Sequence, residues 1–255
     1  FLGAFDLVYA RPPVGYASQI VKEDKFMTVS ASAGGLFKAL VGAGDEVKKG
    51  DVLFTVDTST LSEELTKYEK LYKNTSPYRK EKIDSFKFEN DKKLALKASQ
   101  LLDEGLKGYG LREKDVNYAI GEKGKPAIEG RPDIHFNVSH SKGKVMVCFA
   151  SSEVGCDIEK ISTPDLALAK RFFHNNESEV VKTAPDTFYR FWTLKESFVK
   201  QNGKGLSMPL KDFEVKLDEC LVLDSDNFLA EIDAFDGYCA AICTEEREEI
   251  EIVYI

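Results

Sequence analysis

Two acidic residues stand two positions apart in the segment 154–160 (VGCDIEK), which has the pattern of a strand. Because side chains alternate between the faces of a strand, Asp157 and Glu159 share one face, with Cα atoms about 7 Å apart. Two such carboxylates repel each other unless a cation neutralises them, and Mg²⁺ prefers oxygen ligands of this kind. On the same face, Gly155 allows another group to approach the backbone closely. The segment therefore predicts a magnesium site, with a solvent-facing acidic edge as the alternative.

A third carboxylate belongs to the segment 191–200 (FWTLKESFVK), which has helical spacing. Trp192, Glu196 and Lys200 recur every four residues and therefore share one helix face. Partial desolvation beside the tryptophan would raise the pKa of Glu196 unless a metal ion lay near it. We expect Glu196 to be a metal ligand or a general base, and Lys200 to bind phosphate. The alternative is an ordinary surface ion pair between the two.

Three further segments contain residues suited to binding phosphate: 121–126 (GEKGKP), 137–141 (NVSHS) and 203–207 (GKGLS). The first is not a P-loop, because Pro126 stands where that motif needs Ser or Thr. Ser139 beside His140 does not indicate a hydrolase, since the G-x-S-x-G elbow is missing. The other two histidines, His135 and His174, have no evident partner, and we expect them to be structural.

Helices and strands in mixed blocks must position these residues. Hydrophobic spacing predicts helices over 61–72, 91–106, 165–172 and 186–201, strands over 134–138, 145–149 and 154–158, and mostly strand from 213 to 255. Thr75-Ser-Pro77 should end the first helix, and Pro77 suits the start of the next. This order favours an α+β fold over an alternating parallel sheet.

The first fifty residues differ from the rest. Residues 33–41 and 46–56 read as two strands joined by a turn at 42–45. Residues 44–53 resemble half of a biotinyl or lipoyl domain, but the lysine that carries the cofactor in such domains is absent here. We expect residues 1–50 to form a short hairpin-like appendage without an attached cofactor.

Composition limits the class of protein. The 255 residues carry a formal charge of −8, and 43% of them are hydrophobic, as in an ordinary globular protein. No run of about 18 apolar residues could span a membrane, and the acidity argues against nucleic-acid binding. Five cysteines without a CxxC pair predict reduced core thiols and a cytoplasmic protein. Eight basic residues against four acidic ones between 73 and 97 suggest an anionic partner.

Five motifs in order carry a resemblance to a known family. They are GKP at 124–126, FNVSHS at 136–141, GCDIEK at 155–160, FWTLKESFVK at 191–200 and GKGLS at 203–207. Together they resemble the 4′-phosphopantetheinyl transferases, of the larger monomeric type that serves peptide and polyketide synthetases. The similarity extends over about residues 51–255.

The resemblance implies both a fold and a reaction. The fold would be two similar α+β lobes with pseudo-twofold symmetry, over 51–152 and 153–255, with the site between them. The reaction would move the phosphopantetheine arm of coenzyme A to a serine of an apo acyl or peptidyl carrier protein. It would depend on Mg²⁺ and release 3′,5′-ADP. The partners would be coenzyme A and the carrier protein, without nucleic acid or membrane, and we expect a monomer.

The resemblance also implies residue roles. The metal ligands would be Asp157, Glu159 and Glu196, and the catalytic residues Glu196 and Lys200. The coenzyme A site would comprise Arg79, Lys82, Lys125, Pro126, Ser139, His140, Lys195 and Lys200. Leu94 stands where the family usually has an arginine. The alternatives are a catalytically impaired homologue that only binds the carrier protein or coenzyme A, and another Mg²⁺-dependent phosphotransferase, for which no intact nucleotide loop is present.

Overall fold

The computed structural model describes residues 19–23, 26–30, 36–39, 54–57, 59–233 and 235–255, and it describes side chains from Leu65 onward apart from Leu206. Within that part of the chain, no helix has the length and apolar character that a membrane crossing requires. The chain divides into two compact units, Phe1–Lys70 and Leu71–Ile255. The boundary predicted at residue 50 lies outside the described residues.

In its described residues, the first unit contains two antiparallel strand pairs. β1 (Gln19–Glu23) pairs with β2 (Phe26–Ser30), and β3 (Leu36–Ala39) pairs with β4 (Phe54–Asp57). The strand predicted over 33–41 is confirmed as β3, whereas the described strand of the second prediction begins only at Phe54. The turn predicted at 42–45 lies outside the described residues. Helix α1 (Ser59–Lys73) begins in this unit and ends in the next.

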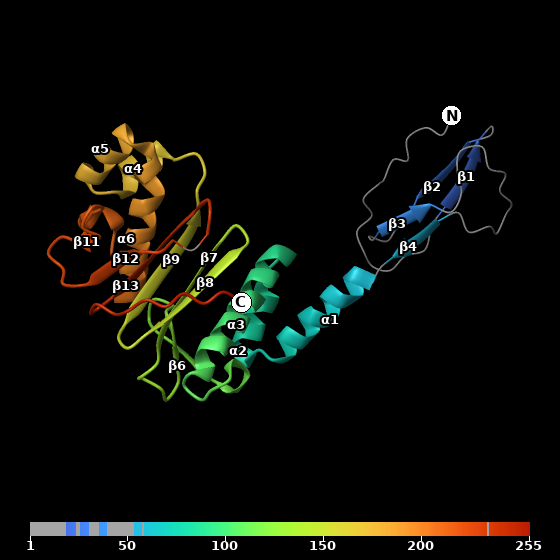
Figure 1. Ribbon diagram of the computed structural model, residues 1–255, viewed down its shortest axis with the longest axis horizontal. Coiled ribbons are helices and arrows are strands. Elements are labelled where there is room, and N and C mark those ends of the chain that lie inside the picture. The colour runs from blue at the N-terminus through green and yellow to red at the C-terminus, as the bar shows by residue number, and fades with distance from the viewer. Residues whose placement is uncertain (1–18, 24–25, 31–35, 40–53, 58, 234) are drawn as a thin grey trace. The chain divides into compact units, whose positions relative to one another are not determined.

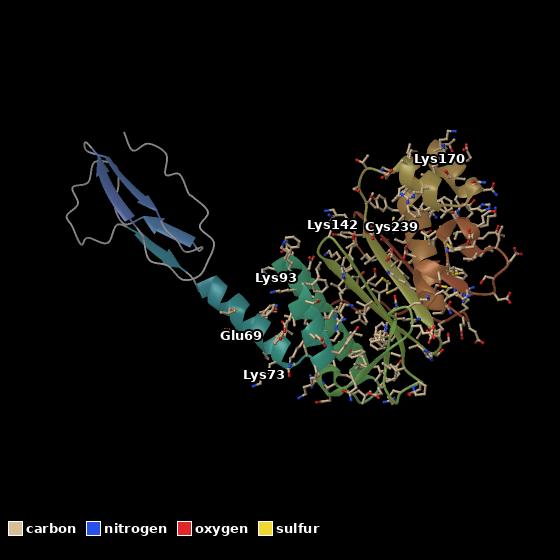
Figure 2. The ribbon with its side chains drawn as sticks, turned by 180° about the vertical axis from the view of Figure 1, so that it is seen from behind. Glu69, Lys73, Lys93, Lys142, Lys170 and Cys239 are labelled. Carbon is tan, nitrogen blue, oxygen red and sulfur yellow. The ribbon has the colours of Figure 1, made fainter. Side chains whose placement is uncertain are left out.

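Three helices precede the sheets of the second unit. After α1 come α2 (Pro77–Ser85) and α3 (Glu89–Lys107). Ser76 is the N-cap of α2, its Oγ accepts a hydrogen bond from the Arg79 amide, and Pro77 opens the helix as predicted. The third helix was predicted over 91–106; it begins two residues earlier and ends one residue later, with Gly108 as its C-cap. Lys73 and Lys93 are exposed on α1 and α3 (Figure 2), whereas Arg79 is buried.

The strands of this unit form small antiparallel sheets. β5 (Tyr118–Ile120) pairs with β6 (Pro126–Ile128), β7 (His135–Ser141) with β8 (Lys144–Ala150), and β10 (Val215–Lys216) with β11 (Leu221–Val222). β9 (Val154–Lys160) lies next to β13 (Tyr238–Thr244), which also pairs with β12 (Phe228–Glu231). Short 3-10 turns occupy Glu113–Asp115, Pro185–Thr187, Gly205–Ser207 and Leu210–Asp212.

Side chains, instead of backbone pairs, join the two main sheets. On β7, Asn137 Oδ1, Ser139 Oγ and Ser141 Oγ accept hydrogen bonds from the backbone amides of Cys156, Ile158 and Lys160 on β9, at 3.0, 3.4 and 3.2 Å. The constant offset of 19 residues means that β7 and β9 run parallel, side by side (Figure 1). We call this line of contacts the seam.

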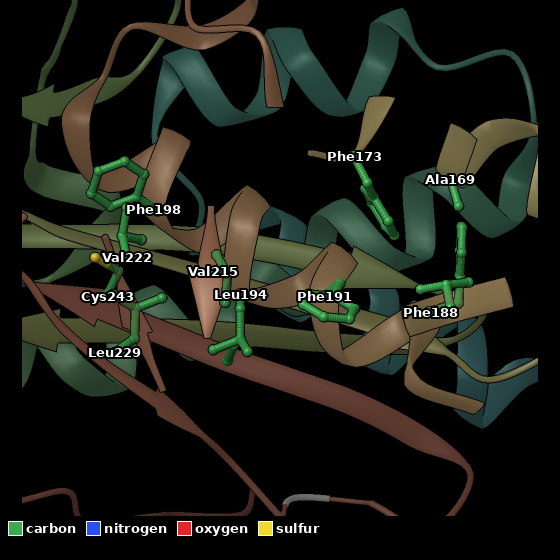
Figure 3. Packing of buried hydrophobic residues seen from close by; sticks show 12 residues of the cluster. Ala169, Phe173, Phe188, Phe191, Leu194, Phe198, Val215, Val222, Leu229 and Cys243 are labelled. Carbon is green, nitrogen blue, oxygen red and sulfur yellow. The ribbon is translucent and has the colours of Figure 1, made fainter. Parts of the chain in front are cut away.

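Helix α6 (Phe188–Asn202) packs on β9 and β13 through one apolar stripe. Phe191, Leu194 and Phe198 belong to a buried cluster that also includes Leu229 and Cys243 from the sheet (Figure 3). The predicted apolar face of this helix is therefore confirmed. Trp192 packs at the edge of the same cluster, and Glu196 and Lys200 follow it along the helix at intervals of four residues. Two short helices, α4 (Leu166–Phe172) and α5 (Asn175–Thr183), complete this half.

Two sequence predictions were wrong. Helix α5 was not expected, although its start carries a capping box in which the His174 amide donates to Glu177 Oε2 and the His174 ring accepts from the Asn176 amide. A histidine cap is unusual, so the signal was missed. Residues 245–255 form no strand, despite their alternating apolar residues, because no neighbouring strand pairs with them among the described residues.

Gly155 is where β9 and α6 come closest. A Cβ atom added there would lie 2.0 Å from the Ser197 carbonyl oxygen and 2.3 Å from the Gln201 amide nitrogen. Backbone atoms of a helix cannot move aside as a flexible side chain can. The close approach predicted at Gly155 is thus confirmed, and the approaching group is α6.

We expect Gly155→Ala to lower the free energy of unfolding by at least about 2 kcal/mol, because α6 must shift away from β9. Urea denaturation followed by circular dichroism measures it. Gly108→Ala is the matched control, since Gly108 has a helical φ of −60° and an added Cβ would meet the Gly105 carbonyl oxygen at 3.3 Å, a tight contact that a shift of a few tenths of an ångström relieves. It should change the unfolding free energy by no more than about 0.5 kcal/mol. Equal effects of the two substitutions would contradict the packing explanation.

Candidate functional site

A cleft of about 310 Å³ opens beside the seam, where β7, β9 and α6 meet. Its lining combines three carboxylates, one lysine, one imidazole, one hydroxyl and two larger apolar side chains: Asp157, Glu159, Glu196, Lys200, His140, Ser139, Trp192 and Val138. The strand and helix faces predicted from periodicity therefore converge on a single site.

Asp157 is the most buried charged residue of the cleft, with 3% of its surface exposed. Its Oδ1 accepts hydrogen bonds from Lys200 Nζ at 2.6 Å and from Ser139 Oγ at 2.8 Å. Its Oδ2 is also buried but has no hydrogen-bond partner among the described residues. A buried carboxylate oxygen without a partner is costly, so a positively charged group at this point would be stabilising.

Lys200 is held by three acceptors. Besides Asp157 Oδ1, its ammonium lies 3.1 Å from Ser139 Oγ and 3.2 Å from the Cys156 carbonyl oxygen. Burial opposes the charge, but the Asp157 carboxylate more than compensates, and the pKa of Lys200 is raised. The lysine therefore stays protonated and places one positive charge in the cleft.

The other two carboxylates are harder to ionise than usual. Burial raises the pKa of Glu159, and the charge of Asp157 adds to this, although the hydrogen bond from Ser141 works against it. Burial also raises the pKa of Glu196; Lys200 lowers it, while Asp157 and Glu159 raise it further. Three acids thus compete for one lysine, which is the electrostatic pattern of a site that accepts a further cation or a proton.

The side chains that line the cleft are of the type that binds Mg²⁺. Asp157, Glu159 and Glu196 supply hard oxygen atoms, and the unpartnered Asp157 Oδ2 is available to an ion. Across the described residues, however, no three His, Cys, Asp or Glu side chains already stand close enough together to hold a metal ion. The predicted trio shares one cleft without forming a finished coordination sphere.

His140 lines the cleft on the side nearest the basic residues of α2. Desolvation lowers the pKa of its ring, and the positive charges of Lys200, Lys82 and, more weakly, Arg79 lower it further, while Asp91 acts in the opposite direction. The imidazole is therefore neutral near pH 7 and can donate one hydrogen bond. The three cations produce a positive field on this side of the cleft, as an anionic ligand requires.

Lys125, Pro126 and Arg79 do not line the cleft. Lys125 Nζ binds Glu153 Oε2 at 2.5 Å and the carbonyl oxygens of Val154 and Gln201 at 3.0 Å each, and Pro126 begins β6. The buried Arg79 guanidinium donates to Ala95 O at 2.9 Å and Ser99 Oγ at 3.1 Å. The side chains of Lys125 and Arg79 are thus bonded to other parts of the chain. The roles of all three residues in binding stay predictions.

Comparison with known proteins identifies the family. Residues 153–243 match the 4′-phosphopantetheinyl transferase superfamily. A 4′-phosphopantetheinyl transferase of Bacillus subtilis is 37% identical over 182 residues, covering 66% of this chain and 81% of that protein. The transferase Sfp of Bacillus subtilis strain 168 is 40% identical over 148 residues, covering 56% and 66%. The human L-aminoadipate-semialdehyde dehydrogenase-phosphopantetheinyl transferase is 34% identical over 167 residues, covering 57% and 53%.

This chain belongs to the 4′-phosphopantetheinyl transferases. The resemblance found in its motifs is thereby confirmed, including the similarity to the Sfp type. The residues of this transferase that line the cleft come from the three central motifs.

One predicted binding residue of the transferase is placed elsewhere. Lys195 is fully buried, and its ammonium binds Glu177 Oε1 at 2.6 Å and the Phe213 carbonyl oxygen at 2.7 Å. It lies on the core side of α6, one residue before Glu196, because consecutive helical residues point about 100° apart. The structure therefore places Lys195 in a buried ion pair outside the cleft, and its assignment to the coenzyme A site stays a prediction.

Ser141 was not among the predicted site residues, although it stands in one of the quoted motifs. Its hydroxyl donates to Glu159 Oε2 at 2.6 Å. The signal was its position two residues after Ser139 on the same strand, which places both hydroxyls on one face.

We expect Glu177→Gln to lower the free energy of unfolding by about 3–5 kcal/mol, because Lys195 would keep a buried charge without its counter-ion. Glu177 also accepts from the amides of Val215 and His174, so three elements loosen together. Urea denaturation measures the change.

Glu179→Gln on the same helix is the control for Glu177. Glu179 pairs with Lys182, and both side chains are largely exposed. This substitution should alter the unfolding free energy by no more than about 0.5 kcal/mol. A small effect at both positions would show that the buried pair is not what stabilises this region.

Proposed function

We propose that this transferase moves the 4′-phosphopantetheine arm of coenzyme A to a serine of an apo acyl or peptidyl carrier protein, depends on Mg²⁺, and releases 3′,5′-ADP. The observation that carries the proposal is the convergence of Asp157, Glu159, Glu196 and Lys200 on one cleft. Three acids for an ion and one lysine for a phosphate suit the transfer of a phosphoryl-linked group.

The reaction exchanges one phosphorus–oxygen bond for another. The serine oxygen of the carrier protein forms a bond to the phosphorus that bears the pantetheine arm. The bond from this phosphorus to the bridging oxygen breaks, and 3′,5′-ADP leaves with the electron pair. The serine proton goes to Glu196. Glu196 lines the cleft together with Lys200, so its carboxylate is placed to accept this proton.

Lys200 and the three carboxylates have different roles toward the charged reactants. The pKa of Lys200 is raised, so its ammonium stays protonated. It would bind the pyrophosphate of coenzyme A. Asp157, Glu159 and Glu196 are the residues that would hold Mg²⁺. When bound, the ion would neutralise phosphate oxygens and stabilise the leaving group.

The nucleotide end of coenzyme A would lie toward His140. Ser139 and the neutral His140 ring offer hydrogen bonds, and Lys82 and Arg79 add positive charge. Lys125 and Pro126 would approach from the turn before β6. Lys195 is not included, because it cannot leave its buried partner without cost.

The lobe arrangement is part of the same proposal. We infer lobes over 51–152 and 153–255 related by a pseudo-twofold axis. The support is that a helix packs on the strands at each side of the seam: α3 contacts β8, the partner of β7, and α6 contacts β9. A homologue that binds coenzyme A or the carrier protein without transfer is the second candidate, favoured by Leu94 and by the internal bonds of Arg79 and Lys125.

The decisive experiment incubates the protein with apo carrier protein, coenzyme A and Mg²⁺, and weighs the carrier by mass spectrometry. We expect a gain equal to one phosphopantetheine group. Asp157→Asn should slow the transfer at least about 100-fold, since it removes a charged ligand from the ion. Asp218→Asn, an exposed site, should leave the rate unchanged. Coenzyme A binding without any mass gain would favour the second candidate.

Excess EDTA should abolish the transfer, and added Mg²⁺ should restore it.

Glu196→Gln should lower kcat by about 10²–10⁴-fold, because the amide cannot accept the serine proton. Circular dichroism of this variant should match the unsubstituted protein. Full activity in excess chelator would remove the metal from the mechanism, and full activity of Glu196→Gln would remove the proposed base.

A further inference from the structure

The three seam residues of β7 do not have equal roles. Asn137, Ser139 and Ser141 each accept a hydrogen bond from a backbone amide of β9. The two serines, in addition, donate their hydroxyl hydrogens to the carboxylates of Asp157 and Glu159, at 2.8 and 2.6 Å. A serine hydroxyl has one hydrogen and two lone pairs, so accepting from the amide leaves the hydrogen directed at the carboxylate.

Glu159 depends on Ser141 more than Asp157 depends on Ser139. Asp157 is also bound by Lys200, whereas the Ser141 hydroxyl provides the one hydrogen bond that the Glu159 carboxylate makes within the described part of the chain. Glu159 is only half-buried, and a glutamate has three side-chain torsions to restrain. Ser141 is itself only 8% exposed and is fixed by the Lys160 amide, so it provides a rigid support.

From this geometry we propose that Ser141 is a positioning residue of the metal site, which orients the Glu159 carboxylate toward the ion; the inference rests on the proposed function. The Ser141 hydroxyl lies 2.6 Å from Glu159 Oε2 and is itself fixed by the Lys160 amide. Carboxylate ligands of metal ions are usually held by hydrogen bonds of this kind, and their removal weakens metal binding about 10- to 100-fold. Asn137 accepts the same kind of hydrogen bond from β9 but contacts no carboxylate. Substituting Asn137 therefore tests the joining of the two strands separately from the orientation of the carboxylates.

The test measures metal binding directly. The full chain, with saturating coenzyme A, is titrated with Mn²⁺, and free Mn²⁺ is followed by electron paramagnetic resonance. We expect Ser141→Ala to raise the Kd for Mn²⁺ about 10-fold. Ser141→Thr, which keeps the hydroxyl and suits a strand, should restore a Kd within about twofold of the unsubstituted protein. Asn137→Ala should leave the Kd unchanged, although it removes a bond across the same seam.

Activity and stability provide the second readout. For Ser141→Ala, the Mg²⁺ concentration at half-maximal rate should rise, while kcat at saturating Mg²⁺ and the KM for coenzyme A should stay near their original values. A purely structural role would instead lower the urea midpoint of Ser141→Ala and Asn137→Ala together and leave the Mn²⁺ affinity of both unchanged.

Two variants with side chains of the same shape keep the test valid if Ser141→Ala does not fold. Ser141→Thr has a hydroxyl group where Ser141→Val has a methyl group. Only the Ser141→Thr protein should bind Mn²⁺ tightly. Equal Kd values for the two would overturn the inference while leaving the proposed function intact. An unsubstituted protein that transfers phosphopantetheine but binds no Mn²⁺ would overturn the metal site, and the role of Ser141 with it.

Discussion

The strands that carry the polar residues of the cleft, β7 and β9, face each other along the seam without pairing backbone to backbone. Each of three β7 side chains occupies the place where a neighbouring strand's carbonyl would normally accept a hydrogen bond. A side chain between two strands keeps them farther apart than the roughly 4.8 Å of an ordinary sheet. The gap that results is polar on the side facing α6, and there the cleft forms.

The seam also explains why so much charge can be buried in one place. Asp157 would be costly if it stood alone, but it accepts from a hydroxyl of β7 and an ammonium of α6. The same alternation that points Asp157 and Glu159 toward the cleft points Val154, Cys156 and Ile158 into the core, where each is almost completely buried. Strand periodicity therefore separates the polar site from the apolar core within seven residues.

Helix α6 serves the site and the core at once. Its apolar stripe and the buried Lys195–Glu177 pair fix its rotation, and the absent side chain of Gly155 lets it lie directly on β9. With this rotation fixed, Glu196 and Lys200 face the carboxylates of β9. Two adjacent residues, Lys195 and Glu196, thus have different environments, one fully buried in a structural ion pair and one lining the cleft.

Periodicity and motif order determined a large part of this description from the sequence. The alternation over 154–160 and the four-residue spacing of Trp192, Glu196 and Lys200 depend only on local backbone geometry, so the shared faces and the family followed from residues alone. Contacts between distant segments could not be read in this way. Only the tertiary structure decided that Lys195 pairs with Glu177, that Arg79 and Lys125 bind internal partners, and that Ser141 holds Glu159. The reason is physical: a side chain's direction follows from its own backbone, whereas its partner depends on how separate elements pack.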